Sequence, residues 1–569
     1  MTMTASIAEF TKEPKIAYFS MEIGVRSDMP TYSGGLGVLA GDTIKSAADL
    51  NLPLVAVTIL TKKGYFKQEL DIYGRQTELP DEWDPNNFMT QLKEKVSVFI
   101  EDREVYISAW LYVVESMRGT KVPIIFLDTD LPENAPEDRG ITHYLYGGDQ
   151  AYRLKQEIVL GIGGTRMLDE LGFEIKKYHM NEGHSALLTL ELLKKYKRDI
   201  EEVWDERLVW DEEKVRSLCV FTTHTPVAAG HDKFPYDLVQ KIMCNIIPIN
   251  VIQELAGREH LNMTMLALNL SNYINGVAKK HGEVSKGMFP GYEIHAITNG
   301  VHSFTWTCDS MKRLYDKYLP GWANEPEIFV RVGRIPDDEL WEAHMEAKRH
   351  LIDYVNRETQ TGMNYDTLTI GFARRATAYK RADLLFTDID RLAYIGEGRL
   401  QIIYAGKAHP RDESGKQLIQ RIFEIKEKLK DKIKIAFLKN YNMELALKLV
   451  SGVDVWLNTP LRPLEASGTS GMKATHNGVP NFSVLDGWWI EGWIEGFTGW
   501  AIGPLPDVPA DPARDADDLY YKLETVIIPT FYNDKHTWIR IMQNAIGKNA
   551  YYFNSHRMMR RYVTEAYIR

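Results

Sequence analysis

The sequence predicts an α/β protein made of two doubly wound, mainly parallel sheets with a ligand site in the cleft between them. Three observations indicate this fold. Short β-rich runs alternate with longer amphipathic segments, the alternation restarts in the second half, and each half carries a glycine-rich loop before a helical segment. The chain has 569 residues, enough for two large domains with sizeable cores.

In the first half, the predicted strands are residues 15–20, 53–60, 122–127, 175–180 and 218–223. Amphipathic helices are expected at 152–171 and 186–195, and a further helix at 38–50. Two runs, 96–100 and 105–113, predict a hairpin, so this half is not purely parallel.

The second half shows a cleaner alternation. We expect strands at 368–373, 401–405, 433–438 and 454–458, with helices at 380–395, 415–430 and 443–450 between them. Proline and glycine cluster at 288–292, and the connection that follows places the domain boundary near residue 300, giving domains 1–300 and 301–569. The last segment, 534–569, is predicted to be helical.

Composition excludes several classes of protein. Lys+Arg 68 against Asp+Glu 78 gives a net charge of −10, which leaves no basic field for nucleic acid. The longest apolar stretches, such as 52–60, fall short of the ~20 residues that cross a bilayer. Cys219, Cys244 and Cys308 form no CxxC pair, which argues against a disulfide framework or a structural zinc site. We therefore expect a cytoplasmic protein with no nucleic-acid or membrane partner.

Two glycine-rich loops are candidate anion sites. The first is Ser33-Gly34-Gly35-Leu36-Gly37, and the second runs from Glu465 to Gly471 and opens a short helix containing Lys473. Glycine N–H groups, hydroxyls and a helix N-terminus suit phosphate. Each loop also fits a simpler interpretation, a plain turn for the first and an N-capped serine loop for the second.

Basic residues follow the strand 368–373, at the edge where open α/β sheets bind ligands. Arg374-Arg375 and Lys380-Arg381 flank a turn there. At the start of the predicted helix 380–395 these cations would oppose the helix dipole, which favours an anionic ligand over a solvated charge run.

His184 and His224 each follow a predicted strand, where polar side chains suit sugar hydroxyls. A zinc site is not expected, because His179 and His184 lack the spacing of a metal-binding helix, and we predict no metal. For the tryptophans between 488 and 500, packing is favoured over stacking on carbohydrate.

The second loop resembles the pyridoxal-phosphate signature of the α-glucan phosphorylases, the family of glycogen, starch and maltodextrin phosphorylases. The match covers residues 465–473 and Asn477-Gly478. Supporting matches run along the chain at 33–37, 155–157, 181–184, 223–225, 298–300, 375–381, 406–408 and 486–487. The run Asp486-Gly487-Trp488-Trp489 is similar to the short bacterial and archaeal branch.

The resemblance implies two Rossmann-like domains of the GT-B type, with the last helix, about 534–569, packing back on the first domain. The first domain would serve the glucan and phosphate, and the second the cofactor. The implied reaction is reversible phosphorolysis of α-1,4-glucans from the non-reducing end, releasing α-D-glucose 1-phosphate with retention. A homodimer is usual in the family, although no dimer patch is recognisable in the sequence.

The resemblance also implies roles for individual residues. Lys473 would bind pyridoxal 5′-phosphate as a Schiff base, with Thr469, Ser470 and Arg374 near the cofactor phosphate. Catalytic roles fall to Arg375, Lys380, His224 and Glu465. Substrate contacts fall to Gly34, Gly35, His184, Asn299, Ser467, Gly468 and Tyr441.

Departures from the family pattern and alternative functions also follow from the sequence. Val38 replaces an arginine common in the animal and plant enzymes, and only 32 residues precede Ser33. We therefore expect no phosphorylation switch or nucleotide activation through an N-terminal extension, so AMP should leave activity unchanged. The main alternative is a synthase-like glycosyltransferase using a nucleotide sugar, which would lack the Lys473 signature. A catalytically silent glucan-binding protein is the second alternative.

Overall fold

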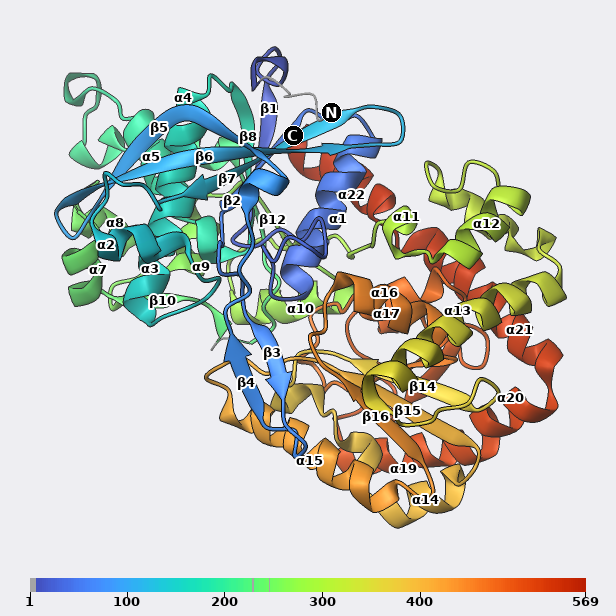
Figure 1. Ribbon diagram of the computed structural model, residues 1–569. Coiled ribbons are helices and arrows are strands. Elements are labelled where there is room, and N and C mark those ends of the chain that lie inside the picture. Colours follow the sequence, from blue (N-terminus) through green and yellow to red (C-terminus); the bar gives the residue numbers. More distant parts are fainter. Residues whose placement is uncertain (1–6, 228–229, 245, 569) are drawn as a thin grey trace.

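The computed structural model describes residues 7–227, 230–244 and 246–568, and it contains two large sheets, one in each half of the chain (Figure 1). The first sheet has nine strands in the order β13-β12-β9-β8-β1-β2-β7-β6-β5. Their bounds are β1 Lys15–Phe19, β2 Leu54–Ile59, β5 Thr90–Ile100, β6 Arg103–Glu115, β7 Lys121–Asp128, β8 Ile175–Asn181, β9 Cys219–Thr222, β12 Tyr273–Gly276 and β13 His295–Ala296. Neighbours from β13 to β7 pair in parallel, whereas β5 and β6 form the predicted antiparallel hairpin.

The second sheet has six parallel strands in the order β16-β15-β14-β17-β18-β19. Their bounds are β14 Leu368–Ala373, β15 Leu400–Ala405, β16 Lys434–Leu438, β17 Val455–Asn458, β18 Asn481–Val484 and β19 Gly499–Ile502. Counted from β14, this is the 3-2-1-4-5-6 order of the doubly wound dinucleotide-binding fold. The predicted α/β architecture with two mainly parallel sheets is confirmed.

The central strands of both sheets are covered on both faces, which explains why they are mostly apolar. In β1, Ala17 and Phe19 belong to one core cluster, and Ile16 and Tyr18 to another. In the second sheet, Ile402 and Ile403 likewise belong to different clusters. The main helices are α1 Gly35–Asp49, α3 Gln150–Ile158, α4 Gly164–Glu170, α5 Leu188–Lys195, α10 Lys279–Met288, α13 Asp337–Thr359, α15 Glu413–Leu429, α16 Met443–Gly452 and α19 Pro512–Lys522.

The helix predicted at 380–395 is wrong in its first half. Short 3-10 turns occupy Ala378–Lys380 and Leu384–Phe386, and α14 spans only Ile389–Gly396. The cause is Arg381, whose backbone is left-handed (φ 46°) and whose guanidinium donates to the carbonyls of Thr459 and Pro460. The argument from a helix dipole therefore does not apply to Arg374, Arg375 and Lys380.

Polar strands that the sequence did not indicate form a hairpin, β3 Lys67–Leu70 and β4 Gln76–Leu79, which extends from the first half to the second (Figure 1). The Gln68 amide donates to the Gly406 carbonyl at 3.0 Å, and the Gln76 amide donates to the Ala408 carbonyl at 2.8 Å. The hairpin is therefore hydrogen-bonded to the loop that follows β15.

The segment predicted to be helical at 534–569 contains α21 Lys535–Asn544 and α22 Ser555–Tyr562, separated by a π-helical stretch. The α21 helix packs against α13 in the second half, whereas α22 packs against α1 in the first half. Among the described residues, no helix is long and apolar enough to cross a membrane.

Gly300 lies where the connection between the halves touches the C-terminal segment. A Cβ there would come within 2.1 Å of the Asn554 carbonyl oxygen, and Val301 exchanges backbone hydrogen bonds with Phe553 and Ser555. We expect Gly300→Ala to lower the free energy of unfolding by at least about 1–3 kcal/mol through overpacking. Denaturant unfolding measures this, with Gly287→Ala in α10 as control, because no atom of the described residues lies within 4 Å of a Cβ there. Equal stability of the two variants would contradict the expectation.

Candidate active site

Residues singled out from the sequence lie at the switch points of the two sheets, where open α/β sheets bind ligands. In the second sheet, the strand order reverses between the neighbours β14 and β17. Arg374 and Arg375 follow β14, and the loop containing Glu465 follows β17. In the first sheet, the order reverses between β1 and β8, and the segments containing Glu22 and His184 follow these two strands. A Cβ on Gly34 would lie 3.4 Å from the Arg375 guanidinium, so the loops of the two halves meet.

A buried charge cluster lies at the switch point of the second sheet. The Lys380 Nζ is 3.0 and 2.8 Å from the two carboxylate oxygens of Glu465, and the Arg374 guanidinium is 2.5 Å from one of them. Burial alone would raise the pKa of Glu465, but the two cations hold it at about 2. Glu465 is therefore ionised at neutral pH and fixes both cations near the carboxyl ends of β14 and β17.

This cluster predicts a pH dependence of stability. The folded-state pKa of Glu465 lies below the ordinary value of about 4.3, so its contribution is present above that pH and is lost as pH falls toward 2. We expect Glu465→Gln to destabilise the protein by about 3 kcal/mol at pH 6, and by progressively less below pH 4. Denaturant unfolding at several pH values measures the difference.

The matched control for that series is Glu339→Gln, which removes the exposed ion pair with Lys317. We expect no measurable effect from it. A Glu465→Gln difference that stays constant from pH 6 to pH 3 would contradict the assignment.

The first glycine-rich loop, residues 33–37, is anchored by the side-chain carboxylate of Glu22. Glu22 accepts hydrogen bonds from the Ser33 N–H at 2.6 Å, the Gly34 N–H at 3.2 Å and the Tyr146 hydroxyl at 2.9 Å. The N–H of Gly34 is thus already engaged, which differs from its expected role toward phosphate. The first-turn amides of α1, beginning at Gly35, have no helical acceptor and remain suited to an anion.

Arg375 is the exposed cation at this meeting point. Within residues 7–227, 230–244 and 246–568, it forms no ion pair with a carboxylate. Tyr441, which is also expected near the substrate, lies near Arg374. Burial raises the pKa of Tyr441, and the positive charge of Arg374 opposes that rise.

Lys473 lies in α17 Ser470–Thr475, buried behind the second glycine loop. Its ammonium lies 4.0 Å from the centre of the Trp306 ring, and Trp306 donates from its indole N–H to Asp42 at 2.8 Å. Burial lowers the pKa of Lys473 to about 8, with Asp42 opposing the change. A far larger fraction of the amine is therefore unprotonated near neutral pH than in an ordinary lysine, and the unprotonated amine can react with a carbonyl.

The rest of the second loop is shaped by close backbone packing. Gly468 has φ +73°, and a Cβ there would lie 3.6 Å from the Glu465 carboxyl carbon. The Ser467 carbonyl accepts from the Trp488 N–H at 2.9 Å. The Thr469 backbone carbonyl accepts from the Lys473 backbone N–H at 3.1 Å, whereas the Ser470 hydroxyl accepts from the indole N–H of Trp456. Trp488, Trp489 and Trp500 are buried, so the packing role predicted for them is confirmed.

The two predicted histidines are neutral polar groups at the ends of β8 and β9. His224 Nε2 lies 2.6 Å from the Asn181 side-chain oxygen, and burial lowers the pKa of His224 to about 3. His184 Nε2 lies 3.2 Å from the Arg153 guanidinium, and burial lowers its pKa to about 4.

Asn299 occupies the connection between the halves. Its carbonyl accepts from Arg557 at 2.8 Å, and its buried side-chain oxygen has no partner in the described part of the chain. No hydrogen bond or ion pair among the described residues joins Asn299, His184 or His224 to the Glu465 cluster.

Several residues that shape the site were not identified from the sequence. Glu22, Tyr146 and Arg153 connect the glycine loop to His184: the Arg153 guanidinium lies 4.7 Å from the Tyr146 ring centre and 2.9 Å from Asp232. The Met21-Glu22 pair directly follows a predicted strand, and that position is a signal that could have revealed Glu22.

The fold and site define an α/β protein with two mainly parallel sheets, a buried cluster of cations around Glu465, and a buried lysine with a lowered pKa. A model of the carbohydrate phosphorylases matches residues 247–494, and the chain belongs to the carbohydrate phosphorylase family, whose members are enzymes that use pyridoxal 5′-phosphate.

Individual relatives are similar over nearly the whole chain. A maltodextrin phosphorylase of Thermococcus litoralis is 43% identical, over 98% of this chain and 70% of the relative. A glycogen phosphorylase of Aquifex aeolicus is 37% identical, over 98% of this chain and 87% of the relative. An uncharacterised protein of Methanocaldococcus jannaschii is 34% identical, over 97% of this chain and 99% of that protein.

The residues around Lys473 fit the cofactor of this family. The lysine amine is buried, makes no hydrogen bond within the described chain and has a lowered pKa, as a lysine that binds a carbonyl group requires. Arg374 supplies a cation that Glu465 fixes at the carboxyl end of β14.

Proposed function

We propose that this protein catalyses the reversible phosphorolysis of α-1,4-glucans from the non-reducing end, releasing α-D-glucose 1-phosphate with retention. The observation that carries the proposal is the meeting of the exposed Arg375 with the glycine loop of the opposite half, together with the buried Arg374–Glu465–Lys380 cluster and the buried Lys473. A two-phosphate site needs fixed cations of this kind.

Each group then has a chemical task. Arg375 and the open amides of α1 bind the substrate phosphate, while Arg374, Thr469 and Ser470 hold the cofactor phosphate. Lys473 holds the cofactor itself. When bound, pyridoxal 5′-phosphate supplies a phosphate group that can exchange a proton at neutral pH.

The glucosyl unit at the cleaved bond is bound by polar groups of both halves. His224, neutral at physiological pH, and Asn299, whose side-chain oxygen has no partner in the described chain, suit sugar hydroxyls. Ser467, Gly468 and Glu465 complete the contacts from the second half, and His184, Gly34 and Tyr441 border them. Positive charge that develops on the sugar is stabilised by the neighbouring phosphate.

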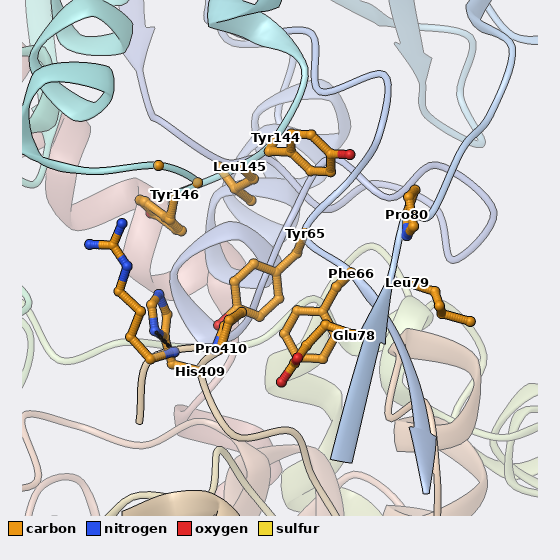
Figure 2. Close-up of a pocket in the computed structure, with 13 residues that line it drawn as sticks. Tyr65, Phe66, Glu78, Leu79, Pro80, Tyr144, Leu145, Tyr146, His409 and Pro410 are labelled. Carbon is orange, nitrogen blue, oxygen red and sulfur yellow. Dashed lines mark hydrogen bonds between the residues drawn. The ribbon is translucent and has the colours of Figure 1, made fainter. Parts of the chain in front are cut away.

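The remainder of the glucan would occupy a cavity of about 280 Å³ between the halves. Figure 2 shows the rings of Tyr65 and Phe66 at the base of the β3–β4 hairpin, with Tyr144 and Tyr146 on one side and His409 on another. Tyr146 donates to Glu22 below the glycine loop, so the cavity adjoins the phosphate site. Aromatic faces flanked by polar groups suit the faces and hydroxyls of glucose units.

We expect Tyr65→Ala to raise KM for maltoheptaose about 10-fold while leaving KM for phosphate nearly unchanged, because it removes about 1.4 kcal/mol of ring contact. Steady-state kinetics with each substrate varied in turn measures this. Ile72→Ala at the exposed hairpin tip is the control and should change neither constant. Equal effects of the two variants on KM for maltoheptaose would contradict the placement of the glucan in this cavity.

The reverse reaction separates this function from a nucleotide-sugar synthase. With a maltodextrin primer, we expect chain extension and phosphate release from α-D-glucose 1-phosphate, and no extension from UDP-glucose or ADP-glucose. Extension from a nucleotide sugar alone would establish the synthase instead.

We further propose a GT-B type arrangement with the sheets facing across the cleft, a boundary near residue 300, and a homodimer. The three cysteines are unpaired, which supports a reducing compartment, and we propose the cytoplasm.

A further inference from the structure

Two histidines and one carboxylate from distant parts of the chain meet at the C-terminal end of α1. Asp49 is the last residue of α1, His302 precedes α11 Ser303–Trp306, and His556 lies in the first turn of α22. One Asp49 oxygen lies 2.8 Å from His302 Nε2 and 2.9 Å from His556 Nε2. All three side chains are at most 10% exposed. The cluster lies about 20 Å along α1 from the glycine loop.

We propose that Asp49, His302 and His556 form a Zn²⁺-binding site. Imidazole nitrogen and carboxylate oxygen are preferred zinc ligands, at about 2.0–2.2 Å from the ion. Ligand atoms around a tetrahedral ion at that distance lie roughly 3.3 Å apart, so each nitrogen–oxygen distance to Asp49 needs to lengthen by only about half an ångström. The three atoms already lie within 4.8 Å of one another.

A second shell is present for His302. Its Nδ1 lies 2.7 Å from the Thr305 hydroxyl, which also accepts from the Lys45 ammonium at 3.2 Å. Zinc-ligating histidines donate their other ring N–H to such an acceptor. Without metal, the Nε2–H groups of both histidines donate to Asp49, and His302 Nδ1 accepts from the Thr305 backbone N–H at 3.3 Å as the N-cap of α11. With metal on Nε2, each imidazole would carry its proton on Nδ1. His302 would then exchange that amide contact for donation to the Thr305 hydroxyl, and His556 Nδ1 has no partner among the described residues.

The site also has room for a further ligand. A cavity of about 240 Å³ is lined by Asp49 and His302, together with Lys45, Thr305 and Phe304. Three protein ligands and an open position accessible to water match a zinc site that is not closed by a fourth side chain. Bound zinc would cross-link α1, α11 and α22.

The test uses the full chain, stripped with a chelator, re-equilibrated with ZnCl₂ and desalted before elemental analysis. His556→Gln is the informative variant, because its amide N–H can still donate to Asp49 whereas the amide is a weak zinc ligand. His536→Gln, which removes an exposed histidine near Asp337, is the matched control.

We expect one tightly held zinc per chain in the wild type and in His536→Gln. In His556→Gln, affinity should fall by more than the about 10–100-fold that loss of an outer-shell partner costs. Equal zinc retention in wild type and His556→Gln would overturn the site. If that variant does not fold, Co²⁺ added to the wild type decides: intense visible absorption of four-coordinate cobalt supports the site, and its absence overturns it. Neither readout depends on phosphorolysis.

Discussion

Lys473→Ala is expected to lower the rate of glucose 1-phosphate release by about 1,000-fold. This is the upper end of what removing one preorganised electrostatic group costs. The lysine amine is buried against Trp306 and has a pKa lowered to about 8, and it is the group that we propose binds the cofactor. The measurement is the initial rate with maltodextrin, phosphate and added pyridoxal 5′-phosphate. Absorbance of the purified protein reports cofactor content in the same samples.

Two comparisons keep that result interpretable. Lys522→Ala, which removes a lysine pairing with Glu495 and Asp518 in α19, should retain both activity and cofactor. Circular dichroism establishes that Lys473→Ala is folded. An active Lys473→Ala variant that contains no cofactor would contradict the role assigned to this lysine.

Arg375→Ala is expected to reduce kcat/KM for phosphate by about 100-fold. The guanidinium is exposed beside Gly34 and has no carboxylate partner in the described chain, so its hydrogen-bonding capacity is available to the substrate. Two charge-assisted hydrogen bonds to a phosphate account for about 3 kcal/mol, which corresponds to this loss. Initial rates across a range of phosphate concentrations measure it.

Arg375→Lys should recover only part of the loss, because an ammonium cannot form the two parallel bonds of a guanidinium. Arg421→Ala, on the outer face of α15, removes an exposed arginine and should leave KM for phosphate unchanged. An Arg375→Ala variant with normal phosphate dependence would place the phosphate elsewhere.

Most of the fold could be predicted from the sequence, because buried parallel strands appear as short apolar runs. The strands predicted at 15–20, 368–373 and 401–405 are mostly apolar and lie within one residue of β1, β14 and β15. The charged and glycine-rich segments were also recognisable, because switch-point residues directly follow such strands. The assigned roles of individual site residues, including Asn299 and Ser467, remain predictions.

Other features depend on contacts that no local pattern contains. The hairpin strands Lys67–Leu70 and Gln76–Leu79 are polar, and their amides bond to the opposite half of the molecule. The left-handed Arg381, which prevents the predicted helix, is held by carbonyls almost 80 residues away. The engagement of the Gly34 N–H by Glu22 likewise requires the folded loop.

The most direct test of the proposed phosphorolysis is to incubate the holoenzyme with maltoheptaose, with and without inorganic phosphate, and to follow the products by ³¹P and ¹H NMR. The expected result is α-D-glucose 1-phosphate and maltohexaose, formed only when phosphate is present. Glucose released without phosphate, or the β-anomer of the sugar phosphate, would contradict retaining phosphorolysis at this site.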